Sequence, residues 1–139
     1  MTKYLLETST CSYLMANHPQ VKACLASVQV ADYPFTCPIV RGEILFGVEL
    51  LPVGRRRGSL ENQAKNLFSG LICAPIPEKA GDFYALMKRQ AQQRGTPLDE
   101  CDLWIAATAL AIDAILVTSD SDFQRVQGVL GLRLEDWMV

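Results

Sequence analysis

The feature that most constrains the fold is the alternation of short apolar runs with longer segments of helical apolar spacing along the 139 residues. The short runs predict strands at residues 3–6, 35–37, 71–74, 115–118 and 132–134. The longer segments predict helices at about residues 10–16, 19–29, 38–51, 59–68, 78–93, 100–112 and 121–126. Strands that alternate with helices form a parallel sheet covered on both faces. We therefore expect an α/β fold in a single domain over residues 1–139, with a central parallel sheet of about four to five strands.

Composition removes several classes of protein. Apolar residues make up 50% of the chain and charged residues 20%, at a net charge of −2, so a general nucleic-acid coat protein is excluded. The longest uncharged apolar stretch, Leu103–Ile112, is too short to span a membrane. No signal peptide is evident, and we expect a cytoplasmic location with no membrane contact. The five cysteines are widely spaced with no C-x-x-C pair, which predicts small buried side chains rather than disulfides or a zinc site.

Four carboxylates lie in apolar surroundings. Glu7 and Asp120 follow predicted strands, whereas Glu43 and Asp102 lie inside predicted helices. A carboxylate beside core residues must be paired, protonated or bound to a metal, because burying a lone charge is costly. Ligands of open parallel sheets bind beyond the carboxyl ends of the strands, where Glu7 and Asp120 lie. If the four converge, their oxygens form a site for a hard divalent cation.

Each acid also has an ordinary structural interpretation. Glu43 can lie at the edge of an apolar helix face, Asp102 can be a first-turn acid, and Asp120 can cap the helix that follows it. After Glu7, Thr8 or Ser9 can cap the next helix, and Asp99 can cap the helix that carries Asp102. A predicted loop between two glycines contains Arg55, Arg56 and Arg57. These arginines either form a solvated segment or contact phosphate or a partner protein. The sequence pattern by itself leaves these alternatives open.

Four ordered motifs resemble the PIN-domain family, and within it the VapC-type toxins of toxin–antitoxin pairs. YLLETSTCSYL is similar to the opening strand and acidic turn of the family, and RGEILFGVE is similar to its second motif. The block GTPLDECDLWIAATAL is similar to the third motif, and LVTSDSDFQRV to the fourth. The matching acids are Glu7, Glu43, Asp102 and Asp120.

The resemblance implies a PIN-like fold and a Mg²⁺- or Mn²⁺-dependent endoribonuclease that cleaves RNA, such as tRNA or rRNA, through metal-activated water. The four acids would bind the metal. It further implies a cognate antitoxin protein and a homodimer. Around the acids, Thr8, Ser9, Thr118, Ser119 and Asp122 are expected to hold water or a phosphate oxygen, and Arg55, Arg56 and Arg57 to steer RNA.

One departure from the family pattern opens an alternative function. Glu7 stands where the family usually has aspartate, and Ser9 replaces the usual asparagine. One extra methylene moves a carboxylate by about 1.5 Å, an error that can be expensive in catalysis. The alternative is therefore a catalytically impaired or silent PIN-like domain that binds only RNA or an antitoxin. A receiver-type phosphoacceptor domain is disfavoured, because Glu7 has no adjacent acid and no lysine follows Arg94.

Overall fold

The computed structural model describes residues 1–139 as five strands, six α-helices and two short 3-10 helices. The strands are β1 (Lys3–Leu6), β2 (Tyr33–Thr36), β3 (Ile72–Cys73), β4 (Ala114–Val117) and β5 (Leu134–Glu135). The α-helices are α1 (Thr8–Met15), α2 (Pro19–Ala26), α3 (Pro38–Glu49), α4 (Arg55–Ser69), α5 (Lys79–Gln93) and α6 (Glu100–Ala111). The 3-10 helices are η1 (Ser121–Val126) and η2 (Val129–Gly131).

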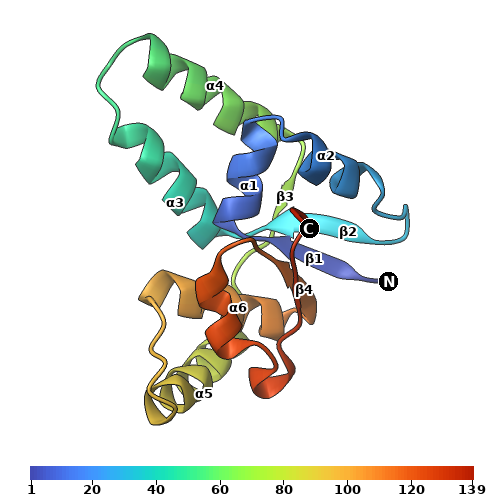
Figure 1. The fold of residues 1–139 in the computed structure, drawn as a ribbon, viewed down its shortest axis with the longest axis vertical. Helices are drawn as coiled ribbons and strands as arrows, with labels where there is room; N and C mark the ends of the chain where they lie inside the picture. Colours follow the sequence, from blue (N-terminus) through green and yellow to red (C-terminus); the bar gives the residue numbers. More distant parts are fainter.

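The five strands form one parallel sheet in the order β3-β2-β1-β4-β5. Helices α1 to α4 lie on one side of this sheet, and α5 and α6 lie on the other (Figure 1). The expected α/β architecture with a parallel sheet of four to five strands is confirmed. Because β1 is paired with β2 on one side and β4 on the other, the turns that follow β1 and β4 leave the sheet next to each other.

The core is centred on the two middle strands. Leu5 and Leu6 of β1 and Leu116 and Val117 of β4 are fully buried, as expected for strands covered on both faces. Helix α6 is buried on most of its circumference, and three of its alanines, Ala106, Ala107 and Ala109, have no exposed surface. Small side chains let α6 pack closely between the sheet and α5, which fixes the position of its N-terminal turn.

The arginine triplet corrects the sequence analysis. Arg55, Arg56 and Arg57 form the first turn of α4 rather than a loop, and the helix begins after Gly54 instead of at Ser59. Arg57 explains the earlier start, since it bonds Glu61 one turn further along the helix at 3.0 Å. It also reaches back to Glu49 of α3 at 3.0 Å, which joins the two helices of the hairpin.

Smaller differences concern element ends and cysteines. Helix α2 ends at Ala26 rather than residue 29, the segment 121–126 is a 3-10 helix, and the last strand begins at Leu134 instead of residue 132. Cys11 and Cys37 are buried as expected, whereas Cys73 and Cys101 are exposed because they lie on an edge strand and in the first turn of α6. None of the helices combines the length and the apolar character needed to cross a membrane.

Candidate metal centre

Three of the four predicted acids come together at the carboxyl end of the sheet. Glu7, Asp102 and Asp120 each place one carboxylate oxygen within 4.8 Å of those of the other two. They come from three distant segments, after β1, in the first turn of α6 and after β4. We call these three residues the acidic trio.

The sheet brings Glu7 and Asp120 together through the pairing of its middle strands. Leu6 lies opposite Val117, and the Glu7 amide donates to the Val117 carbonyl at 3.0 Å, which extends the pairing by one residue. The buried Thr10 hydroxyl of α1 donates to the same carbonyl at 2.8 Å. The turn that carries Glu7 is therefore fixed to Val117 at the end of β4, three residues before Asp120.

Burial and repulsion from neighbouring acids disfavour the charged forms of Asp102 and Glu7. Burial, followed by the neighbouring charges of Asp99, Asp120, Glu43 and Glu7 in that order, raises the pKa of Asp102 to about 7. Burial also raises the pKa of Glu7, although hydrogen bonds from Ser9 and Thr118 oppose the shift. None of the five ion pairs in the protein involves the trio or Glu43. The group therefore lacks the positive charge that its carboxylates require.

Glu43 lies beside the trio rather than within it. Its Oε1 accepts a hydrogen bond from the Thr8 hydroxyl at 2.6 Å. Glu43 forms a second group with Asp99 and Cys101, again with ligand atoms within 4.8 Å of one another. The two groups adjoin, because the charge of Glu43 raises the pKa of Asp102.

Asp99 is the residue of this neighbourhood that sequence reasoning assigned differently. It occupies the N-cap position of α6, but its side chain makes no capping hydrogen bond. Its spacing of three from Asp102, which puts both acids on one helix face, was the available signal.

The capping interpretation is confirmed at Asp120 and wrong at the start of α1. Glu7, rather than Thr8 or Ser9, caps α1 by accepting from the Ser9 amide, and Asp120 caps η1 by accepting from the Asp122 amide. Both acids thus have a structural role in addition to their place in the trio. A cap uses one carboxylate oxygen and leaves the other for a further ligand.

Of the polar residues predicted around the acids, three donate hydrogen bonds to these acids and two have other side-chain partners. The Ser9 and Thr118 hydroxyls both donate to Glu7 at 2.6 Å, as Thr8 does to Glu43. The Ser119 hydroxyl instead donates to Asp136 at 2.8 Å, and Asp122 pairs with Arg125 at 3.4 Å.

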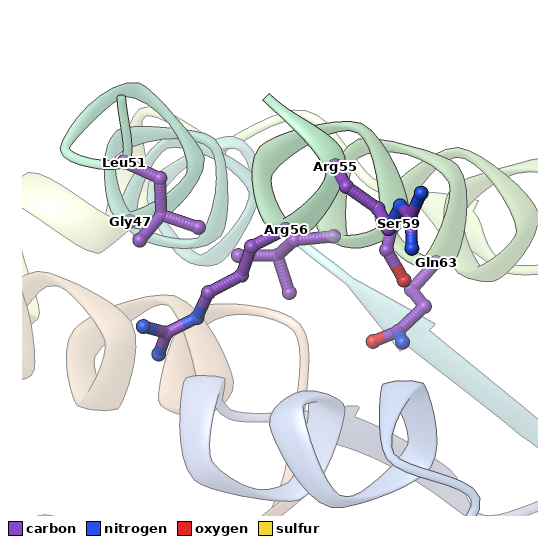
Figure 2. Close-up of a pocket in the computed structure, with 7 residues that line it drawn as sticks. Gly47, Leu51, Arg55, Arg56, Ser59 and Gln63 are labelled. Atoms are coloured by element: carbon purple, nitrogen blue, oxygen red, sulfur yellow. The ribbon is translucent and has the colours of Figure 1, made fainter. Parts of the chain in front are cut away.

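Arg55 and Arg56 line an open surface pocket of about 700 Å³ between α3 and α4, together with Gly47, Leu51, Ser59, Leu60 and Gln63. Their side chains point to opposite sides of the view in Figure 2. Both arginines are exposed and form no ion pair, whereas Arg57 is held by Glu49 and Glu61. Two of the three arginines are thus free for an outside anion.

The family assignment follows from the match of the whole site and fold with known proteins. The PIN domain matches residues 4–129, which contain all four predicted acids. The chain belongs to the PIN-domain family.

Within this family the relatives of the chain are VapC toxin ribonucleases. Ribonuclease VapC1 of Haemophilus influenzae is 26% identical over 96% of this chain and 97% of its own. VapC ribonuclease Y4jK of Sinorhizobium fredii is 29% identical over 84% of this chain and 86% of its own. Among solved structures, VapBC2 from Rickettsia felis, bound to a DNA fragment from its promoter, matches with a TM-score of 0.85 and 26% identity over 98% of this chain and 99% of that one. The predicted resemblance to VapC-type PIN domains is thereby confirmed.

The donor set of this PIN domain fits a hard divalent cation. All three ligand groups of the trio are carboxylates, the donors that Mg²⁺ and Mn²⁺ prefer over nitrogen or sulfur. The absence of any lysine or arginine paired with them leaves the negative charge of the trio for such an ion to balance.

Proposed function

We propose that this chain is a metal-dependent endoribonuclease, the toxin of a type II toxin–antitoxin system. The single observation that carries the proposal is the convergence of Glu7, Asp102 and Asp120 without a basic partner. In this proposal the trio holds Mg²⁺ or Mn²⁺, and Glu43 contributes from its adjoining position. The ion would supply Lewis acidity for activating water and for stabilising charge on the phosphate oxygens.

The residues of the chain have separate tasks in this proposal. The trio holds its carboxylates close together at a fixed sheet edge, so little reorganisation accompanies metal binding. Asp102 must release its proton to bind the ion, since a pKa of about 7 leaves it partly protonated near neutrality. Arg55 and Arg56 contact the RNA backbone beyond the acidic mouth.

The partners are proposed from the relatives. VapBC2 of R. felis is named as a pair of proteins, which supports an antitoxin that binds this chain as well. The expected homodimer stays a prediction. The RNA target is proposed only as a class, structured RNA such as tRNA or rRNA.

The alternative of a silent domain rested on the extra methylene of Glu7. Glu7 nevertheless reaches the other two acids, and this supports the active function over a role limited to binding.

The test is cleavage of RNA in Mn²⁺ by the protein and by its Asp102→Asn variant. Loss of an outer partner of a metal ligand typically costs ten- to hundredfold, so loss of a proposed ligand should lower the cleavage rate by more than about a hundredfold. Asp113→Asn is the matched control, because Asp113 is exposed and has a positive φ that asparagine tolerates. Equal cleavage by all three proteins would identify a contaminating nuclease and remove the assignment. Metal binding without cleavage would favour the silent domain.

A further inference from the structure

The Glu7 carboxylate is held unusually tightly at one of its two oxygens. Oε1 accepts hydrogen bonds from the Ser9 hydroxyl at 2.6 Å, from the Thr118 hydroxyl at 2.6 Å and from the Ser9 amide at 3.0 Å. A carboxylate oxygen offers about two lone-pair directions. Three donors therefore saturate Oε1.

The main chain fixes the direction of both hydroxyl protons. The Ser9 oxygen accepts from the Ser119 amide at 3.0 Å, and the Thr118 oxygen accepts from the Asp120 amide at 3.0 Å. Each hydroxyl has only one proton to donate. With an amide proton on its acceptor side, each hydroxyl directs its own proton to Glu7.

The arrangement spans two elements that the sheet already holds together. Ser9 lies in the first turn of α1, and Thr118 directly follows β4. Their two oxygens are 3.4 Å apart, so both hydroxyls approach Glu7 from the same side. Neither hydroxyl has a proton left to donate to a water or a phosphate oxygen.

We propose that Ser9 and Thr118 are positioning residues that limit Glu7 to one metal-binding oxygen and so make the site select Mg²⁺ or Mn²⁺ over Ca²⁺. This inference rests on the proposed metal-dependent function. Ca²⁺ takes six to eight oxygen ligands and commonly binds carboxylates through both oxygens, whereas Mg²⁺ requires a compact octahedral set. A carboxylate with one saturated oxygen suits the smaller set and disfavours the larger.

The experiment titrates Mn²⁺ and Ca²⁺ separately into the metal-free protein by calorimetry, and compares Ser9→Ala, Thr118→Val and the double variant with the wild type. Ser12→Ala is the control, because it removes an exposed hydroxyl of the same helix that makes no side-chain hydrogen bond. Ser9→Thr is the conservative variant, since it keeps the hydroxyl that Ser9→Ala removes. Thermal unfolding establishes that each variant is folded, and the single variants decide the question if the double variant does not fold.

The expected result is a ten- to hundredfold weaker Mn²⁺ affinity in the double variant, the usual effect of losing partners of a metal ligand. Ca²⁺ affinity should fall much less, because the released oxygen becomes available for a second bond. The ratio of the Mn²⁺ affinity to the Ca²⁺ affinity should therefore fall by about tenfold or more in the double variant. This ratio should be unchanged in Ser12→Ala and close to the wild-type value in Ser9→Thr. A preference that stays at the wild-type ratio would overturn the inference while leaving the nuclease proposal intact. A wild-type protein that binds no Mn²⁺ would instead overturn the proposed function.

Discussion

Among single residues, Asp102 illustrates how the site holds charge at a cost to the fold. Its side chain is only 8% exposed, and four other carboxylates contribute to raising its pKa. An acid whose pKa is higher in the folded than in the unfolded state binds its proton more tightly when folded. Rising pH therefore weakens the fold through this residue until the carboxyl is fully ionised.

This gives a pH prediction with a definite sign. Between the ordinary value of 3.8 and the folded value of about 7, the folded protein keeps a proton that the unfolded chain has released. The melting temperature of the metal-free protein should therefore fall over this window, and the fall should be smaller in Asp102→Asn. Thermal unfolding at pH 4 to 8 in a chelating buffer measures it. Identical slopes in both proteins would show that Asp102 has an ordinary pKa.

At the level of single residues, the members of the trio could be predicted from the sequence. That Glu43 lies beside the trio and not within it could not be predicted. Glu7 and Asp120 follow core strands and Asp102 lies in a buried helix, so apolar context alone indicated that they need partners. The position of Glu43 depends on a hydrogen bond from Thr8 and on the side-chain conformation, which no spacing rule encodes. The direction of the Ser9 hydroxyl likewise depends on the amide of Ser119, which is 110 residues away in the sequence. The direction of the Thr118 hydroxyl depends on how the turn after β4 places the Asp120 amide.

Among the elements, the α3–α4 hairpin gives its three arginines different roles. Arg57 forms ion pairs that hold the hairpin together, whereas Arg55 and Arg56 form none. Helix starts at Pro19 and Pro38 were predictable because proline favours the first turn of a helix. The start of α4 was not, because glycines on both sides of the arginines indicated a loop. Ion pairs of Arg57 with Glu49 and Glu61 stabilise the helical turn instead. They also leave Arg55 and Arg56 as the candidates for RNA contact.

We predict that Arg55→Ala/Arg56→Ala weakens binding of labelled RNA in metal-free buffer. Each lost phosphate contact should lower the slope of log affinity against log salt by about 0.7 for a single strand. Fluorescence anisotropy at several salt concentrations measures both quantities. The control is Arg89→Ala/Arg94→Ala, which removes the same charge from exposed positions at the C-terminal part of α5. An equal loss in the control would mean that overall charge, and not this hairpin, attracts the RNA.

For the molecule as a whole, the trio joins segments that the chain order separates widely. Glu7 follows β1, Asp102 lies in the first turn of α6 and Asp120 follows β4. A cation held by all three would therefore connect helix α6 to the carboxyl ends of the two central strands. The unfolded chain cannot bring these three groups together, and it should bind the ion far more weakly. Metal binding therefore stabilises the folded state by mass action.

At a free Mn²⁺ concentration one hundred times its dissociation constant, this linkage is worth about 2.7 kcal/mol. For a domain of this size, that corresponds to a rise of roughly 8–10 °C in melting temperature. Calorimetric scans at pH 8 with and without Mn²⁺ measure the rise, at a pH where Asp102 is ionised. Asp102→Asn should lose most of it, while Asp113→Asn should keep it. If Mn²⁺ stabilised Asp102→Asn as much as the wild type, the ion would bind elsewhere, and the three acids would only be neighbours at the sheet edge.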